Sequence, residues 1–503
     1  MRYETIMTHI PRGNGPRAIP RLLLAGALAL SLAGCDTDEL VAVEDPAQLQ
    51  PGATATAAAL PALVNGAFRG FAGGYSGLGD DAFLSASAVI SDEFYWGDSF
   101  TTRFAADRRT LQAPVLGNIS DLAFSRLHQA RMQAQRAYAA IGQFEDDLAD
   151  PDGLRSELRT TEGYIYITLS EGWCGGVPFS DVPDEGDIDP QAIVYGPALS
   201  TAAMNQAAVT FFDEAISLNP SNNLAKVGKA RALLNLGRYA EAGSAVAGIQ
   251  TSYVFAIEHS TNTGAQNNPI TALLDNGRYS ISNLEGGTTA TGTALRPDNN
   301  TAVTDATAEG LNFRTAQDPR VPWRARPGTG RCFTSSIFCW TYLNYPNLDS
   351  DVPLASGVEA RLIEAEAALN AGDAGTMMTR LNTLRANAAS ILPLLHPDQI
   401  QVFPAPTVGA VNLPALADPG DAAGRRALLF RERAFWLFGT GHRQGDLRRL
   451  VRNYGLPQTS VFPSGLYFRA AGSNFGTDVA YPVPFSEENN PEFVRSACVT
   501  SQA

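Results

Sequence analysis

The sequence of 503 residues lacks the motifs that mark most hydrolases and nucleotide-binding enzymes. It contains no HExxH zinc motif, no G-x-S-x-G nucleophile turn and no G-x-x-x-x-G-K-[ST] phosphate loop. The stretch GLGDDA, which begins at Gly77, imitates a dinucleotide loop but follows no strand pattern. These absences predict a protein that is not an enzyme, has no catalytic residues and needs no cofactor.

Histidine is also scarce, and the carboxylates form no evident catalytic pair. A glycosidase needs two carboxylates about 5 to 10 Å apart across a cleft. The adjacent Asp92 and Glu93 do not supply that geometry from their spacing alone. The sequence therefore predicts no metal site, because the histidines beyond the N-terminal segment are well separated: His128, His259, His396 and His442.

Basic residues are fewer than acidic ones. The chain has 37 Lys and Arg against 51 Asp and Glu, a formal net charge of −14, and its only lysines are Lys226 and Lys229. Proteins that bind nucleic acid obtain much of their affinity from basic contacts to phosphate. The charge balance therefore argues against a nucleic-acid partner, while a 45% hydrophobic content is ample for a large core.

Long apolar runs are rare, and the clearest lies near the N-terminus. The run from Leu22 to Leu32 follows a basic segment and precedes small residues. Eleven residues span about 16 Å as a helix, roughly half of a bilayer core, so this run is too short for a membrane anchor. It predicts a secretory signal. A buried N-terminal helix is the alternative, which the flanking charges and terminal position disfavour.

The order Leu-Ala-Gly-Cys that ends at Cys35 resembles the bacterial lipoprotein box. The resemblance implies that residues 1–34 are a lipoprotein signal peptide and that Cys35 carries lipid. Residues 35–51 then form a flexible acidic leader. Lasting attachment needs more than one acyl chain. We expect lipid anchoring in the outer membrane with exposure at the cell surface; the inner face of that membrane remains the alternative.

Beyond Cys35 the chain has few cysteines. An even number in an exported protein permits disulfides, and the stretch RCFTSSIFCW could close a small loop between Cys332 and Cys339. The alternative, which the sequence favours equally, is that these cysteines are buried free thiols. The cysteines concerned are Cys174, Cys332, Cys339 and Cys498.

Helical periodicity dominates much of the remaining chain. Residues 52–75 are rich in alanine, and residues 121–141 carry an apolar stripe behind Ser120, a candidate N-cap. Residues 154–169 repeat that stripe. By contrast, residues 91–104 are typical of a loop.

Two segments predict paired helices. Residues 211–249 resemble a tetratricopeptide unit, in which Gly237 separates two helices with apolar faces. Residues 358–389 repeat the arrangement around the turn NAGDA. Stacked hairpins of this kind bury a continuous core. We therefore predict a mainly α fold, with tetratricopeptide-like helical hairpins forming a right-handed solenoid scaffold.

Between these hairpins the pattern changes. Residues 259–330 are crowded with Thr, Asn, Gly, Asp and Pro, and GRYSISNL, from Gly277, alternates as a strand does. A loop-rich stretch of this length is usually functional or disordered. We predict a body at 52–503, with helical repeats at about 121–250 and 355–455 and a loop-rich excursion carrying short β-strands at about 251–350.

The most specific pattern lies at residues 425–455. The stretch ERAFWLFGTGHR, followed by GDLRRL, resembles the C-terminal signature of the SusD/RagB family, in which a Glu-Arg pair precedes a Gly-containing turn, an Arg and Asp-Leu-x-Arg. Other family-like pieces stand in the expected order. They are the lipoprotein box, TEGYIYITLSEGWCGGVPFSD, DPRVPW, RLIEAEAALNAGD and YPVPFSEENNPEF.

The charged residues of that signature are Glu432, Arg433, Arg443 and Asp446. They could be catalytic carboxylates with their partners. We interpret them instead as a structural motif, because buried charges persist only when they are paired. On this hypothesis the two acids bond to arginines and fix the angle between two packed helices.

The family resemblance implies a function without covalent chemistry. It implies a surface lipoprotein that captures oligosaccharides, or in some members peptides, and caps a SusC-like TonB-dependent outer-membrane transporter. The tether at Cys35 would raise the effective concentration of the cap near its barrel. The rival hypothesis is a periplasmic, outer-membrane-anchored tetratricopeptide scaffold for protein partners, which explains neither the excursion nor the C-terminal signature.

Ligand contacts are expected from aromatic and planar polar side chains, because sugar rings offer apolar C–H faces and hydroxyl groups. At least one ring of the Phe94–Trp96 run must face the core, since neighbouring strand residues point to opposite faces. Two groups of candidates follow. The first is Asp92, Phe94, Tyr95 and Trp96; the second is Trp323, Arg324, Trp340 and Tyr342.

Overall fold

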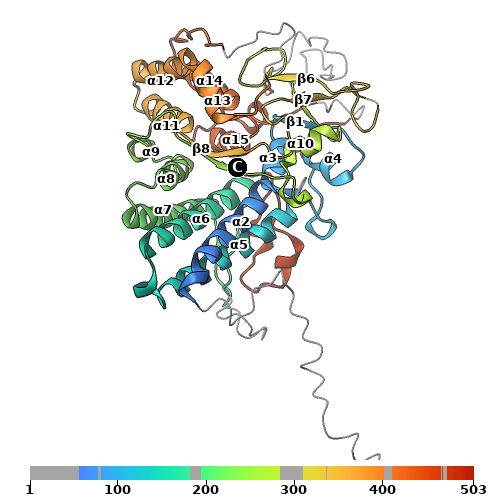
Figure 1. Cartoon of the computed structure of the whole chain (residues 1–503). Coiled ribbons are helices and arrows are strands. Elements are labelled where there is room, and N and C mark those ends of the chain that lie inside the picture. Colours follow the sequence, from blue (N-terminus) through green and yellow to red (C-terminus); the bar gives the residue numbers. More distant parts are fainter. Residues whose placement is uncertain are drawn as a thin grey trace, which may run out of the picture. The chain divides into compact units, whose positions relative to one another are not determined.

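Helices packed side by side in a continuous array form most of the body of the protein (Figure 1). In this computed structural model, successive hairpins contact one another along the array. The residues described are 56–77, 81–181, 194–283, 310–335, 337–400, 411–465, 467 and 473–503. The helical array consists of α2 (Leu60–Ser76), α5 (Asp121–Ile141), α6 (Pro151–Gly172), α7 (Thr201–Leu218), α8 (Asn223–Asn235), α9 (Tyr239–Ala245), α11 (Gly357–Asn370) and α12 (Ala374–Ala386).

Local sequence signals set the ends of these helices. The Asp150 side chain accepts from the Gly153 amide at 2.9 Å, and Pro151 opens α6, where a missing amide hydrogen costs nothing. The Asn222 carbonyl caps α8 in the same way. Gly237, with φ of +74°, turns the chain from α8 into α9. The predicted helical hairpins are therefore confirmed.

The helical array continues in space across the long excursion. Strand β4 (Val254–Ile257) leaves the array and β8 (Val352–Ser356) returns to it, and the two pair antiparallel with Phe255 opposite Ala355. Helix α11 then packs against α9 and α8. The excursion is thus an insertion between neighbouring helices of the array.

Two insertions into the array meet to form a second region, called the strand region. Strand β1 (Phe94–Trp96) lies in the insertion between α2 and α5 and pairs antiparallel with β5 (Tyr279–Ile281). Strand β6 (Trp323–Ala325) pairs with β7 (Trp340–Tyr342), and β5 contacts β7. The helices of this region are α3 (Phe83–Ile90), α4 (Thr101–Asp107) and α10 (Pro269–Asp275); elsewhere β2 (Val177–Pro178) pairs with β3 (Ala198–Leu199).

Two details of the prediction were wrong. The segment 91–104, predicted as a loop, contains β1 and the start of α4. The excursion also contains α10, a helix of seven residues that is too short to show a period and is capped by Asn268. The predicted strand near Gly277 is confirmed as β5.

The C-terminal helices lie between the two regions. Helix α14 packs against α11 and α12, while α15 packs against α3 and α6. The turn between them needs glycine, because a Cβ at Gly441 would lie 2.6 Å from the Tyr75 hydroxyl, and φ there is +79°. These helices are α13 (Ala388–Leu395), α14 (Ala422–Trp436) and α15 (Arg443–Arg452). Short 3₁₀ helices are Ala57–Ala59, Pro114–Leu116, Glu145–Asp147, Gly264–Gln266, Gln458–Ser460, Phe485–Asn489 and Arg495–Ala497.

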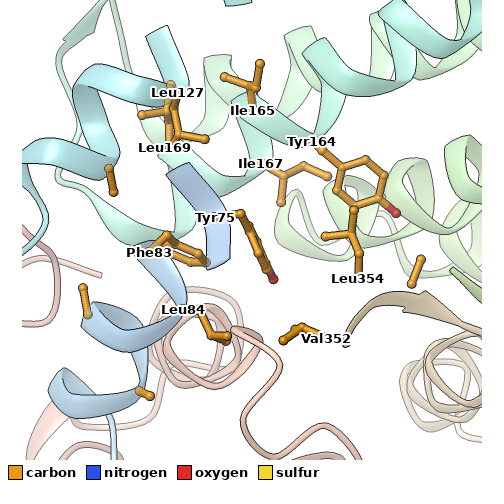
Figure 2. Packing of buried hydrophobic residues seen from close by; sticks show 14 of the residues in the cluster. Tyr75, Phe83, Leu84, Leu127, Tyr164, Ile165, Ile167, Leu169, Val352 and Leu354 are labelled. Carbon is orange, nitrogen blue, oxygen red and sulfur yellow. The ribbon is translucent and has the colours of Figure 1, made fainter. Parts of the chain in front are cut away.

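The main hydrophobic core joins the array to the strand region. Figure 2 shows Tyr75 of α2 and Phe83 of α3 beside Leu169 of α6, with Leu354 of β8 approaching from another side. The rings of Tyr75 and Phe83 are 5.3 Å apart. The Tyr75 hydroxyl donates to the Thr440 carbonyl at 2.8 Å, which ties this core to the turn before α15.

The mainly α fold class with tetratricopeptide-like hairpins is confirmed. All described residues belong to one compact unit, Thr54–Ala503. The predicted signal peptide, Cys35 and the acidic leader lie outside the described residues. Within the described ranges, no helix has the length and apolar character needed to cross a membrane.

Candidate functional site

Several predicted ligand contacts lie in the core. Asp92 is fully buried, and its carboxylate accepts from Nε and Nη2 of Arg443 at 2.6 and 2.9 Å. Phe94 and Tyr342 are also fully buried, with ring centroids 6.3 Å apart. Because these three side chains have no exposed surface, we no longer regard them as ligand contacts.

Tyr95 and Trp340 are covered on the other side of the same strands. The Tyr95 hydroxyl donates to the Phe338 carbonyl at 2.6 Å, and Tyr95 clusters with Trp340 and the neighbouring cysteines. The Arg314 guanidinium lies 3.6 Å from the centre of the Trp340 ring, which is 8% exposed. Tyr95 and Trp340 therefore have little or no surface to offer a ligand.

Three predicted residues keep accessible surface. Trp96 and Trp323 are half-buried and Arg324 is exposed. The Trp323 indole donates to the Arg314 carbonyl at 2.9 Å, which fixes its ring on β6. Trp96, Trp323 and Arg324 therefore remain candidates for ligand contact.

Backbone hydrogen bonds bring three loops together beside Trp96. The Gly97 amide donates to the Arg278 carbonyl at 2.6 Å, and the Phe333 amide donates to the Gly277 carbonyl at 2.8 Å. The Thr334 amide donates to the Gly97 carbonyl at 3.2 Å. A Cβ at Gly97 would lie 2.6 Å from the Gly277 carbonyl oxygen, so this approach requires glycine.

Each of these loops presents an aromatic or cationic side chain to the surface. Phe100 is 50% exposed and Phe333 is 54% exposed. The Arg278 guanidinium lies 5.2 Å from the Phe100 ring centre and 5.5 Å from that of Phe333. We call Trp96, Phe100, Arg278 and Phe333 the aromatic–arginine surface.

The buried carboxylate of Asp98 bonds to residues of this surface and holds them in place. It accepts from the Phe100 amide at 2.9 Å, and from the Trp96 indole and an Arg103 Nη1 group. Arg278 Nη1 lies 3.5 Å from the same carboxylate. Burial raises the pKa of Asp98, which the Phe100 amide and the Trp96 indole oppose. Asp98 thus positions the loop that carries Phe100.

Sequence reasoning missed three members of this surface. Phe100 lies four residues after Trp96, and Phe333 follows Cys332 in a stretch that was already singled out, so an exposed aromatic could have been sought in each. Arg278 gave no such signal. Its position depends on the pairing of β1 with β5, which joins residues that are far apart in sequence.

Both pairs of cysteines are disulfide-bonded in this structure. Cys332 and Cys339 close a small loop with their Cα atoms 4.9 Å apart, and that loop carries Phe333. Cys174 and Cys498 join the end of α6 to the C-terminal segment. The sequence left buried free thiols open as an alternative, but in this structure all four of these cysteines form disulfides.

The signature residues make buried ion pairs. Arg433 Nε and Nη2 donate to the Asp446 carboxylate at 2.7 and 2.9 Å, which links α14 to α15 as the sequence hypothesis proposed. Although burial raises the pKa of Asp446, Arg433 and Arg449 hold it well below the usual range. This part of the motif fixes two packed helices.

The other two signature residues reach farther than that hypothesis proposed. Glu432 accepts from Arg320 Nη1 at 2.6 Å and from Arg385 Nη1 at 2.8 Å, so it bonds to the strand region and to α12. Arg443 bonds to Asp92, just before β1. The hypothesis was incomplete, because these pairs connect regions rather than two helices.

In the described part of the chain, no group of three or more His, Cys, Asp or Glu could hold a metal ion.

The helical array with an inserted strand region defines a tetratricopeptide-like scaffold. Among solved structures this is the SusD fold, so the chain has the fold that its sequence resemblance predicted. No protein-family model and no curated protein matches the sequence.

The similarity to solved SusD-like structures covers most of the chain. A SusD superfamily protein from Bacteroides thetaiotaomicron matches with a TM-score of 0.59 and 15% identity, covering 88% of this chain and 99% of that chain. A SusD superfamily protein from Bacteroides vulgatus matches with a TM-score of 0.57 and 13% identity, covering 89% of this chain and 98% of that chain. A SusD-like carbohydrate-binding protein from Bacteroides vulgatus matches with a TM-score of 0.51 and 13% identity, covering 78% of this chain and 83% of that chain.

Proposed function

We propose that the chain is a surface-exposed binding lipoprotein that captures oligosaccharides or peptides and caps a SusC-like TonB-dependent transporter. The aromatic–arginine surface is the observation that carries this proposal. Exposed rings offer flat apolar faces for the C–H faces of a sugar, and the guanidinium of Arg278 offers donors for hydroxyl oxygens. Trp323 and Arg324 on β6 extend the candidate site.

The fold and the sequence support the remaining parts of the proposal. A SusD-like protein of the same fold is described as carbohydrate-binding. The lipoprotein box at Cys35 accounts for retention at the outer membrane, where a tethered cap stays close to its barrel. The proposed mechanism is capture and release, without catalysis.

A binding screen tests the ligand class. The purified full chain is applied to glycan and peptide arrays, and a ligand found there is titrated against Phe100→Ala and Phe333→Ala variants. Each variant should weaken binding about tenfold, which corresponds to about 1.4 kcal/mol. Phe485→Ala is the matched control, because Phe485 is 51% exposed and lies outside this surface. Equal affinity in all three variants would contradict the proposed site.

Protease treatment of intact cells tests the location. A protein at the cell surface should be digested, whereas a periplasmic scaffold should survive until the outer membrane is opened. A Cys35→Ser variant should leave the membrane fraction if Cys35 is the lipid anchor. Survival in intact cells would favour the scaffold for protein partners.

A further inference from the structure

A cleft of about 500 Å³ lies where strand β4 faces helices α2 and α6 and the turn before α8. We call it the α2–β4 cleft. Its volume falls within the range of about 300–1,000 Å³ that small-molecule sites occupy. Its lining includes none of the residues of the aromatic–arginine surface.

Aromatic rings form the apolar part of the cleft. Phe68 of α2 and Phe255 of β4 meet edge to face, with ring centres 5.6 Å apart and an interplanar angle of 87°. Tyr253 lines the cleft beside them. All three side chains are half-buried, so each is held by packing and still exposes part of its ring. Rigid, partly exposed rings suit the apolar face of a ligand.

One asparagine of the lining is fixed in place by its own hydrogen bonds. Asn222 Nδ2 donates to the hydroxyl oxygens of Ser156 at 3.0 Å and Thr160 at 2.9 Å. Its Oδ1 accepts from the Ala225 amide at 2.9 Å. These bonds hold the Asn222 side chain in a fixed orientation, so the turn before α8 gives the cleft a polar side.

Other amides in the lining retain hydrogen-bonding capacity. Asn219 Oδ1 accepts from the amide and hydroxyl of Ser221 at 3.1 and 2.7 Å, while within the described ranges its Nδ2 donates to no protein group. The side chains of Asn65 and Asn223 make no hydrogen bond to any residue that the structure describes. Each neutral amide offers two donors and an acceptor, which matches the hydroxyl groups of a sugar.

The charges at the cleft do not select an anion, because they are one ion pair and the exposed carboxylate of Glu157. Arg69 Nη2 and Glu258 Oε2 form an ion pair of 3.0 Å, with side chains 57% and 72% exposed. The same pair lines a second cavity of about 410 Å³, which continues along α2 toward His259. Burial lowers the pKa of His259 to about 4, so its ring adds no charge to this cavity at neutral pH.

We infer that the α2–β4 cleft is a second binding site, which takes an uncharged oligosaccharide of a few sugar units. The partly exposed rings of Phe68 and Phe255 stack on sugar faces, and the amides of Asn65 and Asn219 bond to hydroxyl groups. The Arg69–Glu258 pair separates the two cavities, so neighbouring units of the chain occupy one cavity each. This site is independent of the aromatic–arginine surface.

Titration calorimetry on the purified full chain tests the inference. The probes are four neutral trisaccharides, maltotriose, cellotriose, mannotriose and xylotriose, together with anionic trigalacturonate and an uncharged, end-blocked peptide of Ala and Asn. At least one neutral trisaccharide should bind, and both Asn65→Ala/Asn219→Ala and Phe68→Ala should weaken it tenfold or more. Trigalacturonate should bind more weakly than the neutral sugars.

Matched controls separate this site from the surface proposed above. Asn387→Ala removes an exposed amide outside both sites and should leave all sugar binding unchanged. Phe333→Ala alters the aromatic–arginine surface, so it should leave in place the part of the binding heat that the cleft variants remove. The unfolding temperature of each variant shows whether it remains folded, and Asn65→Ala/Asn219→Ala answers the question if Phe68→Ala does not fold.

The outcomes are distinguishable. If no neutral trisaccharide binds, or if the cleft variants weaken only the peptide or trigalacturonate, the inference is overturned. If Phe333→Ala abolishes all sugar binding while the cleft variants bind normally, the cleft is overturned and the proposed function stands. If the cleft variants lose binding and Phe333→Ala does not, the cleft is supported and the aromatic–arginine surface loses its support.

Discussion

The helical array and the strand region are built by opposite kinds of contact. In the array, helices that follow one another along the chain pack together, as α5, α6, α7 and α8 do. In the strand region, β6 and β7 form a hairpin, but Phe94 of β1 pairs with Ile281 of β5, so this ladder joins segments that are far apart in the sequence. The difference shows two ways of building this chain: local packing supplies a scaffold, and pairing between β1 and β5 brings Arg278 beside the loop that carries Phe100.

Buried ion pairs join these two regions. Glu432 of α14 bonds to Arg320 in the strand region, and Arg443 of α15 bonds to Asp92 before β1. The Glu93 carboxylate accepts from the Gly439 amide at 2.8 Å in the same border. The C-terminal signature is therefore the place where the scaffold holds the inserted segments.

The largest effect on stability is expected when this border is broken. Glu432→Ala removes a carboxylate that is 1% exposed and leaves the Arg385 guanidinium without its ion-pair partner. Breaking a buried pair in this way costs about 3–5 kcal/mol of unfolding free energy. Urea unfolding measures it, and Arg425→Ala, which removes an exposed pair with Asp418, should leave the midpoint nearly unchanged. Similar midpoints in both variants would show that the border does not hold the regions together.

Disulfide removal should have the next largest effect, and it compares the regions directly. The Cys174–Cys498 bond spans 324 residues and the Cys332–Cys339 bond spans seven. Loop-closure entropy grows with loop length, so the long bridge should contribute near the upper end, and the short one near the lower end, of about 2–4 kcal/mol. Unfolding of the Cys174→Ser/Cys498→Ser and Cys332→Ser/Cys339→Ser variants measures both. The reverse order would mean that strain or residual structure outweighs loop length.

A titration of stability against pH tests a single buried carboxylate at the border. Burial raises the pKa of Glu93 to about 8, against 4.5 in the unfolded chain, and Oε2 of Glu93 has no hydrogen-bond partner among the described residues. The folded protein therefore holds a proton that the unfolded chain releases. This contribution is complete below about pH 4.5 and is lost as the pH rises through about 8.

Comparison with Glu93→Gln isolates that effect. Glutamine mimics the protonated acid and keeps an acceptor for the Gly439 amide, so the variant should gain stability over the wild type as the pH rises from 5 to 8. His128 and His396, whose pKa values burial lowers to about 3, contribute equally to both proteins and cancel in the difference. A difference that does not change with pH would show that Glu93 is ionised in the folded state.

The same contrast explains how much the sequence could predict. Apolar spacing and caps such as Gly237 act over a few residues, so the helices of the array and both hairpins were predictable. In the strand region, β5 was predictable from its alternation but its pairing was not, because nothing near Phe94 indicates that Ile281 will pair with it. Trp96 was predicted as a candidate because its residue type alone suggests ligand contact. Arg278 was not, because its place on the surface depends on the pairing of two distant strands.

The smallest expected effect separates binding from folding. The Phe333 side chain is 54% exposed and rests beside Arg278 on a loop closed by a disulfide, so its ring removes little apolar area from water. Phe333→Ala should change the unfolding free energy by less than about 0.5 kcal/mol, as substitutions at exposed positions usually do. If its urea midpoint matches the wild type while ligand affinity falls, the strand region is recognising a ligand on a scaffold that the change leaves intact. A clear loss of stability would instead make Phe333 part of the packing of the loop, and its exposed ring would no longer be evidence for a binding surface.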